Sequence, residues 1–167
     1  YGAEAPFLRP QELATDEAPM APVVEHAISY LETKEQYQCS AVVLLQPTAP
    51  LRNANHIDRA IETHRESGTT TVISAFEDHS YRWRPEEDGA EQLNHTGEAS
   101  RRQDKTSEFI ENGAIYILDT QQFLTNGNLR DGSVRIFEMS QRRSIDIDTE
   151  FDLWLAEQSI EHFQKEH

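Results

Sequence analysis

The chain has 167 residues, the length of one ordinary domain, and 37% of them are hydrophobic, which is enough for a core. Its single cysteine, Cys39, excludes a disulfide scaffold and a zinc site built from cysteines. The 30 Asp and Glu residues outnumber the 15 Lys and Arg residues, and the formal net charge of -15 argues against nucleic acid or an anionic membrane as a partner.

The chain begins with a helical pattern that is followed by a strand pattern. Apolar residues recur at helical spacing after Asp16, and Pro19 and Pro22 fit only the first turn of the predicted helix. The continuous apolar run from Ala41 to Leu45 predicts a strand that is buried on both faces of a parallel sheet. A proline-rich loop begins at Gln46, because proline cannot continue a central strand.

The alternation of helix and strand continues beyond this loop. The segment from Ile57 to His64 predicts a second helix that ends at Gly68, and the segment from Thr70 to Ala75 predicts the next strand. From Phe76 to Ser107 the pattern is lost among charges, prolines and glycines. This break predicts a hairpin or an arm rather than core, and its exposed aromatic residues suit a dimer contact.

Regular patterns return in the last third of the chain. The segments Ala114 to Leu118 and Val134 to Met139 predict two strands, with a short helix after Asp119 between them. A last helix is expected to begin at Thr149, which has the spacing of a capping box with Asp152. The alternation as a whole predicts an α/β fold with a mainly parallel sheet, in which ligands bind beyond the carboxyl ends of the strands.

An acidic pair lies in one of the loops expected at that edge, between Ile145 and Asp152. Asp146 and Asp148 are two residues apart, so in an extended chain both carboxylates point to the same side. Two carboxylates are what Mg²⁺ commonly takes from a protein, with phosphate oxygens and waters as its other ligands. The alternative is a solvated acidic turn that caps the last helix.

Four segments, in this order and at these spacings, resemble one family. They are Phe7-Leu8-Arg9-Pro10 followed by Glu12-Leu13-Ala14 and Asp16; Leu44-Leu45-Gln46-Pro47-Thr48-Ala49-Pro50-Leu51-Arg52; Arg102-Gln103-Asp104 followed by Asn112-Gly113-Ala114-Ile115-Tyr116; and Ser144-Ile145-Asp146-Ile147-Asp148-Thr149-Glu150. Together they resemble the acylneuraminate cytidylyltransferases, which activate sialic-acid-like nine-carbon sugars. The resemblance covers nearly the whole chain.

The resemblance implies a three-layer, Rossmann-like nucleotide-diphospho-sugar transferase fold, with one cytidylyltransferase domain over residues 1–167 and an inserted dimerisation arm over residues 76–107. It implies that CMP passes from CTP to a nonulosonic acid, with Mg²⁺ as cofactor, in a homodimer. The glycine- and lysine-bearing loop that holds the triphosphate lies upstream in that family and is not in this sequence. With no secretory leader, a cytoplasmic enzyme is expected.

Two alternatives to this enzyme stay open at the level of sequence. One is a non-catalytic sugar-binding or dimerisation module that lacks the phosphate loop. The other is a cytidylyltransferase for an eight-carbon ulosonic acid, whose family has a different motif at the strand end that here carries Gln46.

The resemblance also implies roles for individual residues. Asp146 and Asp148 would be the catalytic, metal-binding carboxylates, and Arg9 would contact CTP, with a surface salt bridge as its alternative. Gln46 would bond sugar hydroxyls or, alternatively, form a turn. Arg52, in the same loop, either shares in binding or anchors the loop.

Three further residues are candidates for the sugar pocket. Arg102 would bind the carboxylate of the sugar, because a planar guanidinium pairs with a carboxylate through two hydrogen bonds. Tyr116 would line the same pocket, although a tyrosine in a strand is as often part of the core. Arg82 resembles a basic sugar contact, through a looser alignment.

Overall fold

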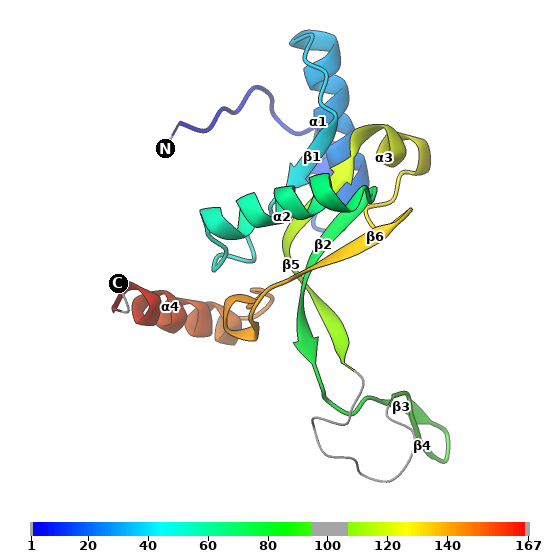
Figure 1. The fold of residues 1–167 in the computed structure, drawn as a ribbon, viewed down its shortest axis with the longest axis vertical. Helices are drawn as coiled ribbons and strands as arrows, with labels where there is room; N and C mark the ends of the chain where they lie inside the picture. Colours follow the sequence, from blue (N-terminus) through cyan, green and yellow to red (C-terminus); the bar gives the residue numbers. More distant parts are fainter. Residues whose placement is uncertain (1, 95–106, 166–167) are drawn as a thin grey trace.

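A four-stranded sheet lies at the centre of the computed structural model, which describes residues 2–94 and 107–165 (Figure 1). The strands are β1 (Ala41–Leu44), β2 (Thr71–Asp78), β5 (Glu108–Asp119) and β6 (Val134–Glu138), in the order β1-β5-β2-β6. β5 runs antiparallel to both of its neighbours, whereas β2 and β6 are parallel. β1, β2 and β6 therefore share one direction, and the predicted α/β class is confirmed.

Helices cover both faces of this sheet (Figure 1). α2 (Ala54–Ser67) packs on one face, and α1 (Met20–Lys34) and α3 (Thr120–Asn126) pack on the other. Successive residues of β5 point to opposite faces, so Ile117 joins the core under α2 while Leu118 joins the core under α1 and α3. The result is the three-layer arrangement that the sequence predicted.

The helices begin and end where their capping residues lie. The side chain of Asn53 accepts a hydrogen bond from the first turn of α2, and Gly68 ends this helix in the left-handed conformation, with a φ of 62°. α4 (Glu150–Lys165) follows Thr149, whose Oγ1 accepts a hydrogen bond from the backbone N–H of Asp152 at 3.2 Å. The predicted capping box is therefore present.

One prediction about the sheet is wrong. The run from Ala41 to Leu45 was expected to be buried on both faces of a parallel sheet, but β1 is an edge strand, and its neighbour in the described chain is the antiparallel β5. Val43 is consequently exposed. An apolar run identifies a strand, whereas its place in the sheet depends on partners that are distant in sequence.

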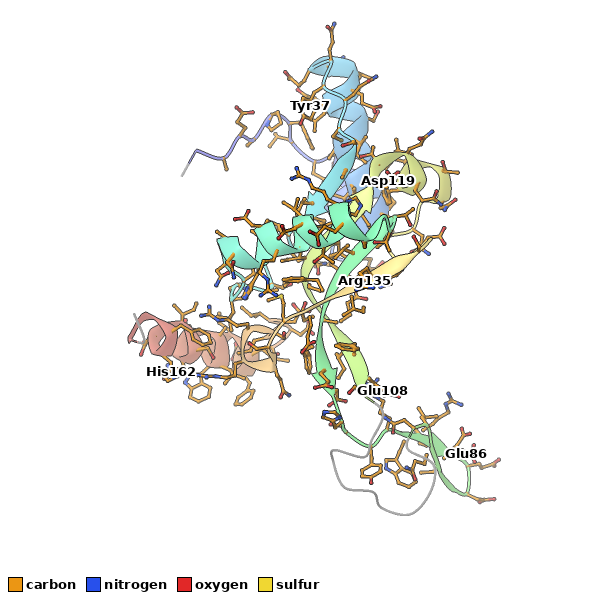
Figure 2. The ribbon with its side chains drawn as sticks, in the orientation of Figure 1. Tyr37, Glu86, Glu108, Asp119, Arg135 and His162 are labelled. Atoms are coloured by element: carbon orange, nitrogen blue, oxygen red, sulfur yellow. The ribbon has the colours of Figure 1, made fainter. Side chains whose placement is uncertain are left out.

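A two-stranded hairpin extends from the sheet in the region where the core pattern is lost. β3 (Trp83–Glu86) and β4 (Gly89–Gln92) pair only with each other in the described chain, beyond the end of β2 (Figure 1). Figure 2 shows Glu86 far from the sheet and Glu108 where β5 begins. The predicted hairpin is present, its role as a dimer contact stays a prediction, and residues 95–106 lie outside the described chain.

The last helix lies beside the sheet rather than in its core. α4 extends away beyond the end of β6 (Figure 1), and its Ala156 is buried while Leu153 and Trp154 are exposed. Two short 3-10 helices complete the described elements, Gln11–Leu13 and Gln141–Arg143. Among the described residues, no helix combines the length and the apolar character that a membrane crossing requires.

Candidate active site

The loop after β1 and the segment before α4 meet at a glycine of β5. Gly113 has a φ of +68°, in the left-handed region that favours glycine. A Cβ atom at this position would lie 2.7 Å from Oε1 of Gln46 and 3.2 Å from Oδ2 of Asp146. The amide and the carboxylate therefore converge over Gly113, and only a residue without a side chain leaves them room.

β5 is irregular at this glycine. Its register with β2 shifts between the partners of Ile73 and Ala75, so that β5 loops out relative to β2. Ser74 lies opposite this bulge, where its Oγ accepts a hydrogen bond from the backbone N–H of Ile115 at 2.7 Å and donates one to Oδ1 of Asn112 at 2.6 Å. These bonds satisfy groups that the bulge removes from the regular strand pairing.

Asn112 also joins the bulge to the acidic segment. Its Nδ2 donates a hydrogen bond to Oγ of Ser144 at 2.7 Å, and that hydroxyl donates to the backbone oxygen of Ser140 at 2.9 Å. Asn112 is 2% exposed and Ser144 is 9% exposed. Because hydrogen bonds are stronger where water is excluded, this network fixes the start of the segment that carries Asp146.

The loop after β1 has its own anchor. Nη1 of Arg52 donates hydrogen bonds to the backbone oxygens of Gln46 and Ala49, the second at 2.7 Å. The backbone N–H of Ile147 donates to the oxygen of Thr48 at 2.9 Å, which ties this loop to the acidic segment. Of the two roles that the sequence left open for Arg52, its contacts show the anchoring one.

The two aspartates differ in their surroundings. Asp146 is half-buried, and its Oδ1 is buried without a hydrogen-bond partner among the described residues, whereas Asp148 is exposed. The described chain contains no group of three or more His, Cys, Asp or Glu residues placed to hold a metal ion. Mg²⁺ commonly takes only one or two carboxylates from the protein, so a buried, unpaired carboxylate oxygen with a second carboxylate nearby in sequence fits this ion.

Tyr116 lies on β5 three residues after Gly113. Its hydroxyl donates a hydrogen bond to the carboxylate of Glu111, which also accepts a bond from Nε of Arg130 at 2.9 Å. Burial raises the pKa of Tyr116, and the hydrogen bond to Glu111 and the charges of Glu111 and Asp146 raise it further, so the side chain is a neutral phenol. Burial alone would raise the pKa of Glu111, but hydrogen bonds from Arg130 and Tyr116 outweigh it and lower that pKa.

The other candidate residues lie apart from this meeting point. Arg82 lies at the base of the hairpin, where its guanidinium forms an ion pair with Glu108 at 3.1 Å. Arg9 is exposed on the segment before α1, and Arg102 lies outside the described residues. Among the predicted site residues, Gln46 and Asp146 meet over Gly113, and Tyr116 lies three residues farther along β5.

Sequence motifs did not reveal the residues that hold this region together. Ser74 was not predicted, Ser144 stood in a quoted motif without a role, and the pairing of Glu111 with Arg130 was not predicted. Ser74 carried a weak signal, because a serine inside an apolar strand is a polar group that needs a partner when it is buried. Arg130 carried none, since its partner lies on another element.

The fold and the site define an α/β protein with polar residues gathered at the carboxyl ends of its strands. No family model matches the chain. It is 30% identical over 160 residues to an N-acylneuraminate cytidylyltransferase of Escherichia coli, a match that covers 93% of this chain and 37% of the relative. It is 29% identical over 136 residues to N-acylneuraminate cytidylyltransferase A of Danio rerio, covering 78% of this chain and 31% of the relative.

A third relative has a name that refers to flagellin rather than to a cytidylyltransferase. Post-translational flagellin modification protein B of Campylobacter coli is 27% identical over 162 residues, covering 94% of this chain and 68% of the relative. The chain spans about a third of the length of the two cytidylyltransferases. These matches confirm the family that the motifs predicted: the chain is related to the acylneuraminate cytidylyltransferases.

Proposed function

We propose that this chain is part of an enzyme that transfers CMP from CTP to a nonulosonic acid and releases pyrophosphate. The observation that carries the proposal is the convergence of Gln46 and Asp146 over Gly113. This point lies at the carboxyl end of β1, where ligands of open α/β sheets bind. Similarity to proteins named N-acylneuraminate cytidylyltransferase supports the same function.

The side chains at this point suit a sugar acid and a nucleotide. The amide of Gln46 would bond sugar hydroxyls, and Tyr116 would line the same pocket. Arg102 would pair with the carboxylate of the sugar through its planar fork, and Arg82 would be a second basic contact. Arg9 would contact CTP. The loop that carries Gln46 is held in advance by its arginine anchor, which reduces the ordering that binding requires.

Asp146 and Asp148 would hold Mg²⁺ beside this pocket. When bound, the ion would offset the negative charge that builds up as a sugar hydroxyl displaces pyrophosphate from the α-phosphorus. The protein contributes the placement of Asp146, because the buried bond between Asn112 and Ser144 fixes the segment just before it. The same placement brings the carboxylate next to the amide of Gln46.

We also propose that the enzyme is a cytoplasmic homodimer with the hairpin as a contact. Tyr81 and Trp83 are exposed at the hairpin, and aromatic residues of this kind are enriched in interface cores. Light scattering of the full-length protein would check the dimer, and a monomer at micromolar concentration would contradict it.

The test is an assay of the full-length protein with CTP, Mg²⁺ and N-acetylneuraminic acid, in which CMP-sugar and pyrophosphate are measured. Wild type should form both products in equal amounts. Asp146→Asn and Asp148→Asn should each lower turnover about a hundredfold at limiting Mg²⁺, because each removes a charged ligand without changing its shape. Asp58→Asn, at an exposed position of α2, is the matched control and should behave as wild type.

The outcomes separate the possible interpretations. Full activity of both aspartate variants at limiting Mg²⁺ would contradict the metal assignment. A collapsed melting temperature together with lost activity would instead indicate a structural cap on α4. Sugar binding without turnover in wild type would contradict the proposed enzyme and favour a non-catalytic sugar-binding module.

A further inference from the structure

Three side chains form a hydrogen-bonded row from an exposed loop to the buried strand β5. Arg130, in the loop between α3 and β6, donates to Glu111 through both Nε and Nη2, at 2.9 and 2.5 Å. Glu111 in turn accepts the hydroxyl proton of Tyr116. The Arg130 side chain is 57% exposed, while Tyr116 is 4% exposed, so the row crosses from solvent into the core.

This arrangement decides what the phenol of Tyr116 can offer a ligand. A tyrosine hydroxyl has one proton and can otherwise donate or accept as its neighbours require. Here the proton is directed to Glu111, and the two-point contact with Arg130 keeps that carboxylate charged and in place. The phenolic oxygen therefore has only its lone pairs left, which makes it a hydrogen-bond acceptor.

The phenol belongs to the region where Gln46 and Asp146 converge. Tyr116 pairs across the sheet with Leu44, two residues before Gln46. Tyr116 also lies three residues after Gly113 on β5, and Gln46 and Asp146 converge over that glycine. An exposed ion pair adds little to the free energy of unfolding. We therefore expect Glu111 and Arg130 to act on ligand binding by orienting the buried ring of Tyr116.

We propose that Glu111 and Arg130 are positioning residues that hold the Tyr116 phenol as a fixed hydrogen-bond acceptor for an N–H or O–H group of the sugar. The inference rests on the proposed function, because it places the sugar beside Gln46 and Asp146. It predicts a defect that is specific to the sugar, since no described contact joins this row to Arg9, the residue proposed to contact CTP.

Steady-state kinetics of the full-length protein with CTP and N-acetylneuraminic acid test this assignment. Glu111→Gln removes the charge that orients the phenol, Tyr116→Phe removes the acceptor, and Arg130→Lys keeps the charge of Arg130 without its fork. Glu66→Gln is the matched control, because Glu66 is an exposed glutamate near the end of α2, away from the hairpin that is proposed as a dimer contact.

Glu111→Gln and Tyr116→Phe should each raise the KM for the sugar about fivefold, with kcat and the KM for CTP near their wild-type values. Arg130→Lys should have a smaller effect in the same direction. The variant with both Glu111→Gln and Tyr116→Phe should be no worse than Tyr116→Phe alone, because both changes remove one oriented acceptor. Glu66→Gln should match wild type.

Three outcomes would overturn the assignment: an unchanged KM for the sugar, equal losses toward both substrates, or additive losses in the double variant. In each case, turnover by wild type would still support the proposed function. If wild type forms no CMP-sugar, the proposed function itself is contradicted. Calorimetric titration with N-acetylneuraminic acid alone then decides the inference: weaker binding by Glu111→Gln supports it, and equal titration curves for Glu111→Gln and wild type overturn it.

Discussion

Two buried asparagines hold two different regions of this molecule, and they differ in what surrounds them. Asn112, 2% exposed, bonds the hydroxyls of Ser74 and Ser144 inside the sheet. Asn94, 9% exposed, accepts from the backbone N–H of Arg82 at 2.9 Å and donates to Glu108 at 2.9 Å, at the base of the exposed hairpin. Water can reach the partners of Asn94 and replace its hydrogen bonds, whereas the partners of Asn112 are buried.

This difference shows how the molecule divides its polar interactions. The hairpin base can exchange a protein hydrogen bond for one to water, so losing its asparagine removes only the small net value of each bond. The site region has no such exchange, because its serines are buried. Rigidity is thereby concentrated where Gln46 and Asp146 converge.

Replacement of Asn112 tests the buried site region and should have the largest effect on the free energy of unfolding. Asn112→Ala leaves the hydroxyls of Ser74 and Ser144 without their partner, and the free energy of unfolding should fall by about 3 kcal/mol. Urea unfolding followed by circular dichroism measures it. Ser74→Ala, which removes one partner of the same network, should lose less. A loss below about 1 kcal/mol for Asn112→Ala would show that the network does not stabilise the site region.

Gly113→Ala should have the next largest effect. The added Cβ meets the side-chain oxygens of Gln46 and Asp146 in a conformation that already disfavours alanine, so unfolding free energy should fall by about 2 kcal/mol and sugar binding should weaken. Gly127→Ala is the matched control: Gly127 has a φ of +63° but nothing within 4 Å of its added Cβ. It should lose only about 1 kcal/mol and keep its activity. If Gly113→Ala and Gly127→Ala lost the same free energy of unfolding and the same sugar binding, the site at Gly113 would not be crowded.

Asn94→Ala should have the smallest effect of the three. We expect a loss of about 1 kcal/mol or less in unfolding free energy, because water can satisfy the freed groups at the hairpin base. The same urea titration measures it beside Asn112→Ala. If the two asparagine variants lose the same free energy, burial is not what distinguishes the two regions.

The sequence by itself determined most of the elements and the resemblance to a family of cytidylyltransferases. Capping residues and helical or strand spacing act within a few residues, so they marked the ends of α2 at Gly68 and the start of α4 at Thr149. The proline-rich loop at Gln46 and the acidic segment at Asp146 were recognised because motifs, too, are local. Their position at strand ends followed from the α/β pattern.

The tertiary structure alone decided how these pieces meet. It placed β5 antiparallel between β1 and β2, which made β1 an edge strand, and it opened β5 at Gly113 so that Gln46 and Asp146 could approach. Asn112 bonds Ser144, which is 32 residues away in sequence. No periodicity records such a partner, because a buried polar group is satisfied by whatever the packed elements bring within hydrogen-bond distance.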